Sequence, residues 1–146
     1  MSYKTSQIDV ATIEMLPGNI FHVMVKPGAE IDLTAAKRLI HATNQMMDDK
    51  IPFRGGIYDV SKITYINEEA REYLTSGADV KGIVVGAAII SNTSLGKMIG
   101  NMLLSLTGTK RFPIQFFESP IRAEHWVRTN MREAMDRMDQ SARKVA

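Results

Sequence analysis

Apolar and polar positions alternate through the first part of the chain. Residues 7–15 alternate loosely, and residues 20–25 form a second, mostly apolar stretch. A Pro-Gly-Asn sequence at 17–19 separates them, and Gly and Asn tolerate the positive φ angles of tight turns. A Lys-Pro-Gly sequence at 26–28 ends the second stretch. The pattern predicts an opening β-hairpin.

Two segments in the middle of the chain have the spacing of amphipathic helices. Residues 33–49 carry an apolar or small side chain every three or four positions, and Asp32 before them is a good N-cap. Asn67 can cap a second helix, whose first turn holds two glutamates and which Gly77 can end. We therefore predict one helix over 33–49 and another from about 68 to 76.

Two further helices are predicted in the second half of the chain. Residues 94–107 follow a polar loop and show an apolar face, and Gly108 can end that helix. Ser119 is an N-cap, and Pro120 stands at the first helical position, where its missing N–H costs nothing. This last helix should run from about 120 to 142, which at about 1.5 Å per residue is roughly 35 Å. That is longer than one layer of a small sheet needs.

Apolar runs between the helices predict three more strands, at 53–60, 82–90 and 113–117. Residues 82–90 are apolar on both alternating sides, which is typical of a central strand covered on two faces. The order β-β-α-β-α-β-α-β-α predicts an α/β fold. We expect a mixed sheet of about five strands with four helices, in a single domain over 1–146.

Composition narrows the possible functions. The 146 residues include no cysteine, which excludes disulfides, thiolate metal sites and cysteine nucleophiles. The net charge of +2 gives no support for nucleic acid as a partner. The longest apolar run, 83–90, is too short to span a bilayer, and the N-terminus lacks the apolar stretch of a signal peptide. We expect a cytoplasmic protein that does not associate with membranes.

Catalytic and metal-binding patterns are missing from the sequence. His22, His41 and His125 fall in three different predicted elements, and none has a partner at a known ligand spacing. The chain has no Gly-x-Ser-x-Gly elbow for a nucleophilic serine. We therefore expect a protein that is not an enzyme and that uses neither a metal nor a cofactor.

One polar loop has two interpretations. Ser91, Asn92, Thr93 and Ser94 stand at the start of the helix predicted over 94–107, and Lys97 lies one turn further in. Free N–H groups at such a place can hold an anion or another polar ligand. The same residues can instead serve as helix caps.

The last helix also has two interpretations. Val127, Met131, Met135 and Met138 form an apolar stripe along it. The stripe can cover the domain's own core, or it can offer an adaptable surface to a second chain, for which methionine is well suited. Because the helix is longer than the sheet requires, we expect a homodimer formed through it.

The segment 57–70 carries a resemblance to a known family. It places Asp59, Val60 and Ser61 at the end of a predicted strand, and Asn67, Glu68 and Glu69 at the start of the next helix. Together with the element order, it resembles the STAS domain, the SpoIIAA-like fold of anti-sigma-factor antagonists, over about residues 8–130. Family members show Asp-Leu-Ser and Asp-Ser-Ser/Thr-Gly at these two places. Three later segments are similar to uncharacterised bacterial SpoIIAA-like proteins, at 99–104, 116–117 and 123–127.

The resemblance implies a non-enzymatic regulatory or protein-interaction domain with a regulatory protein as partner. Asp59, Ser61, Asn67, Glu68 and Glu69 are then the partner-binding or switch-like residues. Glu69 stands where family members carry the Ser or Thr that a kinase phosphorylates, and Asn67 replaces the family's aspartate. A glutamate there either mimics the phosphorylated state or marks the loss of the switch, and we favour the loss.

A small-ligand or lipid-binding domain is the alternative function. The apolar helical segment at 98–106 and the polar loop at 91–94 motivate it.

Overall fold

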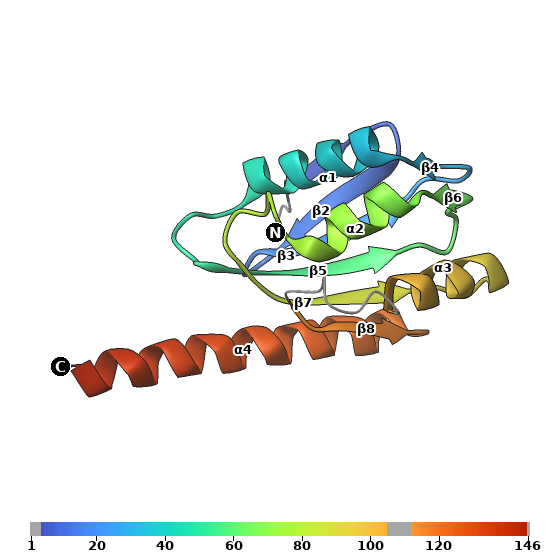
Figure 1. Ribbon diagram of the computed structural model, residues 1–146. Coiled ribbons are helices and arrows are strands. Elements are labelled where there is room, and N and C mark those ends of the chain that lie inside the picture. Colours follow the sequence, from blue (N-terminus) through green and yellow to red (C-terminus); the bar gives the residue numbers. More distant parts are fainter. Residues whose placement is uncertain (1–3, 105–111, 146) are drawn as a thin grey trace.

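The computed structural model describes residues 4–104 and 112–145, which form a mixed sheet with helices on both faces (Figure 1). The six strands of the sheet are, in spatial order, β1 (Lys4–Gln7), β2 (Ala11–Leu16), β3 (Ile20–Val25), β5 (Phe53–Asp59), β7 (Ile83–Ile90) and β8 (Ile114–Phe117). The helices are α1 (Leu33–Met46), α2 (Glu68–Ser76), α3 (Ser94–Leu104) and α4 (Pro120–Val145). The first three strands are antiparallel, and β3, β5, β7 and β8 are parallel to one another. The predicted α/β class and its four helices are confirmed.

The sheet has one strand more than predicted. The stretch expected to form one strand over 7–15 is divided, since β1 ends at Gln7 and β2 begins at Ala11. β1 is polar and mostly exposed at the sheet edge, so it lacks the alternation that marks a half-buried strand. Two further strands, β4 (Glu30–Ile31) and β6 (Tyr65–Ile66), pair in a small sheet of their own and are too short to show a period.

Local capping signals set the helix ends, as predicted. The Asp32 carboxylate accepts a hydrogen bond from the Ala35 amide at 2.8 Å. The Asn67 side chain accepts from the Ala70 amide at 2.8 Å, and Gly77 ends α2 with a φ of 68°. The first helix stops at Met46 instead of residue 49, because the backbone is extended from the next residue. The predicted end of α3 at Gly108 lies outside the described residues.

Two apolar cores lie on the two faces of the sheet. Helices α1 and α2 cover one face, and α4 covers the other (Figure 1). The prediction of a strand covered on both faces holds for the second half of β7, where Ile89 is buried in the core on one face and Ile90 in the core on the other. It is wrong for the first half, where Ile83 is 60% exposed.

Helix α4 lies close to the strands beneath it because two glycines leave room. A Cβ atom on Gly55 would collide with a methyl group of Val127, and one on Gly86 would lie 2.9 Å from the Trp126 ring. The side chains of α4 that face the sheet are buried as far as Ala134. Residues 135–144 are all exposed, and Figure 1 shows this part of α4 projecting past the amino ends of the strands.

Candidate functional site

Two loops meet at the carboxyl end of the parallel strands. β5 and β7 are neighbours, so the loops that follow them lie side by side. The Asp59 carboxylate accepts a hydrogen bond from the Ser61 amide at 3.0 Å. The Thr93 hydroxyl donates to the Ser61 carbonyl at 2.9 Å, and the Asn92 amide donates to the Ser61 hydroxyl at 3.3 Å. The structure therefore joins Asp59 and Ser61 to Asn92 and Thr93, which the sequence had placed in two separate candidate sites.

The polar loop after β7 caps α3. The Thr93 hydroxyl accepts from the Gly96 amide at 3.1 Å, as an N-cap side chain does. Ser91 is buried, and its hydroxyl accepts from the Thr93 amide at 3.2 Å. A Cβ atom on Gly96 would collide with that hydroxyl, so the first turn of α3 needs glycine at this position. Ser94 begins the helix, and the Lys97 ammonium pairs with the Glu118 carboxylate at 3.0 Å. Capping and bonds within the loop account for the Ser91 and Thr93 side chains, and anion binding stays a prediction.

The start of α2 presents two acidic side chains to solvent. Glu68 and Glu69 are exposed in its first turn, and neither has a hydrogen bond or ion pair with any residue in the described ranges. The Asn67 side chain serves as the N-cap, and the Asn67 backbone amide donates to the Ile31 carbonyl at 3.1 Å. Backbone bonds to β4 and its flanks thus hold this helix end in place. Negative charge there is stabilised by the helix dipole.

A small apolar cavity lies between the sheet and the helices α1 and α2. Its water-accessible volume is about 60 Å³. Leu39, Leu74 and Ile89 contribute to its lining, and Tyr58 borders it. Burial raises the pKa of the Tyr58 hydroxyl, and the positive charge of Arg54 partly opposes that shift. None of the residues of the loop at 91–94 lines this cavity.

The described residues contain no group of three or more His, Cys, Asp or Glu side chains that could hold a metal ion. In the same part of the chain, no helix is both long and apolar enough to cross a bilayer.

Comparison with protein families places the chain. Residues 14–131 match the model of DUF7793, a domain of unknown function. The chain belongs to the DUF7793 family. Among solved structures, it is similar to an uncharacterized protein of the DUF3478 family with a SpoIIAA-like fold, from Shewanella loihica PV-4. The TM-score is 0.51 at 13% identity, over 86% of this chain and 92% of that one. The search of curated proteins gave no match.

The structural likeness confirms the predicted SpoIIAA-like fold of this DUF7793 domain. At 13% identity, this similarity shows the fold alone.

Sequence reasoning missed a buried arginine in this DUF7793 domain. Arg54 is 3% exposed, and its guanidinium lies 4.6 Å from the centre of the Phe21 ring. It donates to the Thr43 hydroxyl and, at 2.8 Å, to the Asn44 side chain. Burial lowers the pKa of Arg54, and the Tyr58 hydroxyl partly opposes this. A charged residue at the start of a predicted strand gives no signal of burial.

The methionine stripe of α4 divides into two parts. Val127 and Met131 are buried against the domain's own sheet, so for them the core interpretation is right and a role on a free surface is wrong. Met135 and Met138 are 39% and 42% exposed. Only this second pair remains available to another chain.

Proposed function

We propose that this DUF7793 domain is a non-enzymatic regulatory module that binds a partner protein through the carboxyl end of its sheet. The observation that carries the proposal is the joined surface at that end. The loops after β5 and β7 are held together by hydrogen bonds through Ser61, and α2 begins after the loop that contains it. Its first turn exposes two acids with no ion pair in the described part of the chain. An exposed surface with unpaired charge suits a protein partner of opposite charge.

The chemistry of Glu68 and Glu69 indicates what kind of partner fits. Both are exposed acidic side chains, and neither can be phosphorylated. A partner with arginine or lysine side chains could therefore bind without a kinase step. We infer a constitutive contact, in which the phosphorylation switch implied by the SpoIIAA-like resemblance is absent.

A capture experiment with matched variants tests the proposal. The tagged protein would be compared with Glu68→Gln/Glu69→Gln in an extract of the native organism. The control, Glu72→Gln/Glu133→Gln, removes two exposed acids elsewhere on the surface and so makes the same change of net charge. A bound protein that is lost with the first variant and kept with the control is the expected result. Equal capture by both variants, or no captured protein, would contradict the proposal.

The apolar cavity beneath α1 and α2 supports the alternative function, the binding of a small ligand or lipid. A volume of about 60 Å³ holds roughly two water molecules, whereas ligand pockets commonly measure about 300–1,000 Å³. A lipid would therefore require α2 to move away from the sheet. Native mass spectrometry of the purified protein separates the two functions, because a retained small molecule would favour the alternative.

A further inference from the structure

One flank of α4 carries a regular series of charges. Its members recur every three or four residues, so they share one side of the helix. We call this series the charged stripe: Glu124, Arg128, Arg132, Asp136, Asp139 and Arg143. Four of its members border a groove of about 390 Å³ between α4 and the β2–β3 turn, together with Met131 and Met135. The stripe is at least partly exposed along its whole length.

The order of charges in the stripe is self-complementary. Read along the helix, the signs run minus, plus, plus, minus, minus, plus. Antiparallel pairing with a second copy, about a point near Ala134, sets every charge opposite one of the other sign: Glu124 with Arg143, Arg128 with Asp139, and Arg132 with Asp136. Parallel pairing would instead set each residue opposite its own copy, and like charges repel. The stripe therefore favours one orientation.

The burial of α4 changes at the same point. The helix is buried against its own sheet as far as Ala134, and residues 135–144 are exposed. An isolated helix of that length is marginal in water. A two-fold axis near Ala134 would lay the projecting half of each helix beside the sheet-bound half of the other. The two sheets would then stand at opposite ends of the helix pair.

We propose that two copies of this chain form an antiparallel, two-fold dimer through the charged stripe, with Met135 of each copy near the axis. The occupant of the groove beside α4 is thus the α4 helix of a second copy. The charge order argues for a second copy over an unrelated helix, because it complements itself. Methionine at the centre gives the contact an adaptable apolar middle. This inference does not depend on the proposed partner site.

A charge exchange between Arg128 and Asp139 tests the pairing. These residues stand eleven positions apart, about 16 Å along one helix, so they cannot contact each other within a chain. Asp139→Arg sets two arginines against each other at two symmetric places. We expect the dissociation constant, measured by analytical ultracentrifugation, to rise about tenfold or more. Arg128→Glu should do the same, but it also removes the ion pair that Arg128 makes with Glu124 of its own chain at 3.3 Å. Recovery of dimerisation in the double variant is therefore the decisive measurement.

Matched controls lie on the other flank of α4. Glu133→Arg and Arg137→Glu make equal changes of charge on side chains that border a different groove, so they should leave the dissociation constant unchanged. A monomer at 100 µM wild-type protein would overturn the proposal. So would equal effects at both flanks, or failure of the double variant to recover.

A cross-link gives a second, independent measurement. The chain has no cysteine, so a single substitution introduces one defined thiol. Met135→Cys should form a disulfide-linked dimer under mild oxidation, because residue 135 lies near the proposed axis. Glu133→Cys, at the same level on the other flank, should stay monomeric under the denaturing conditions of the gel. Equal cross-linking of both variants would refute the geometry.

Discussion

Asn19 joins the β2–β3 turn to the connection between α1 and β5. Its side-chain amide donates to three backbone carbonyls, those of Asp48 at 2.9 Å and of Ile51 and Phe53 at 3.3 Å. Its side-chain oxygen accepts from the Asp48 amide at 2.9 Å. The residue is 1% exposed and has a positive φ of 60°. One side chain thus satisfies several backbone groups of a segment about thirty residues away.

These contacts set the size of the effect expected for Asn19→Ala. Each hydrogen bond contributes about 1 kcal/mol net. The amide has two N–H hydrogens, so its three donor contacts count as two bonds; with the bond that its oxygen accepts, the net loss is about 3 kcal/mol. Alanine at positive φ costs about 1 kcal/mol more. We expect Asn19→Ala to lower the free energy of unfolding by about 4 kcal/mol, and Asn19→Gly, which tolerates the φ, by about 3 kcal/mol.

Equilibrium unfolding in urea, followed by circular dichroism, measures both variants. With a slope of about 2 kcal/mol per molar, the Asn19→Ala midpoint should fall by about 2 M. Asn130→Ala is the control, because that amide donates a single hydrogen bond, to the Val85 carbonyl, from within a helix. It should cost about 1 kcal/mol. A loss below about 2 kcal/mol for Asn19→Ala would show that the Asn19 hydrogen bonds do not stabilise the fold as argued. Equal losses for alanine and glycine would show that the positive φ angle contributes nothing.

Three further predictions concern titration, packing and capping. Burial, together with the hydrogen bond to Asp79, raises the pKa of Tyr73 to about 12. The folded state therefore keeps this proton to higher pH than the unfolded state, so the stabilisation is complete below about pH 10 and is lost as pH rises toward 12. Asp79→Asn should lower the pKa of Tyr73 in a spectrophotometric titration. An unchanged titration curve would contradict this prediction. Gly55→Ala should destabilise by about 1–3 kcal/mol through collision with Val127, and adding Val127→Ala should restore part of it in urea unfolding; no recovery would count against the collision. Asn67→Ala should cost about 1 kcal/mol by thermal unfolding, and Asn67→Asp should cost less because it keeps a capping oxygen; equal losses would show that capping is not the cause.

Features with a local cause could be predicted from the sequence. Asp32 and Asn67 act as caps because their side chains bond the amide three residues on, and no distant residue is needed. The length of α4 follows from its own periodicity and from Pro120 at its start. The SpoIIAA-like fold could be reached because the order of strands and helices is itself a sequence property.

Features with a distant cause could not be predicted. Arg54 is buried because α1 supplies Thr43 and Asn44 and β3 supplies the Phe21 ring, a set that forms only in the folded sheet. Ser61 and the 91–94 loop were assigned to separate sites because the sequence does not say that β5 and β7 are neighbours. The methionine stripe of α4 has the same apolar spacing before and after residue 134. Only the position at which the sheet ends divides it into a buried and an exposed part.

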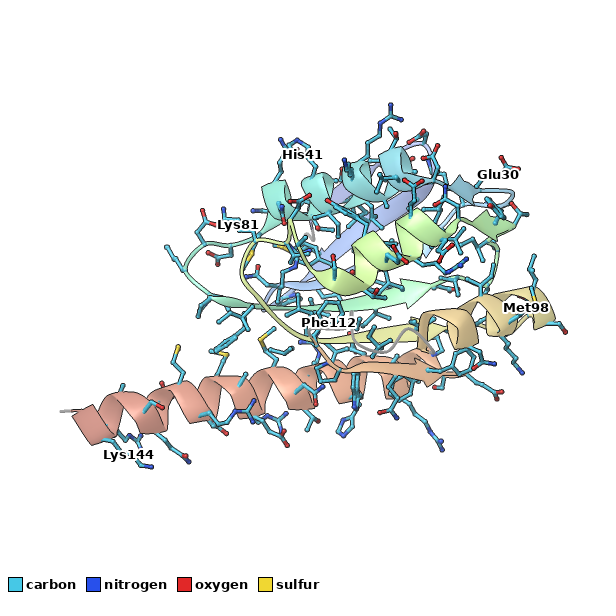
Figure 2. The ribbon with its side chains drawn as sticks, viewed as in Figure 1. Glu30, His41, Lys81, Met98, Phe112 and Lys144 are labelled. Atoms are coloured by element: carbon cyan, nitrogen blue, oxygen red, sulfur yellow. The ribbon has the colours of Figure 1, made fainter. Side chains whose placement is uncertain are left out.

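The projecting half of α4 and the proposed partner site lie at opposite ends of the molecule, which makes the two proposals separable. In Figure 2, Lys144 marks the end of the projecting half of α4, and Met98 marks α3 beside the loops at the carboxyl end of the strands. A dimer formed near Ala134 therefore leaves both partner sites free and directed apart. We expect Asp139→Arg to bind a captured partner in solution with the same affinity per chain as the wild type, but to be released faster from a surface coated with that partner, because one attachment replaces two. A loss of affinity in solution would show that the partner site requires the dimer.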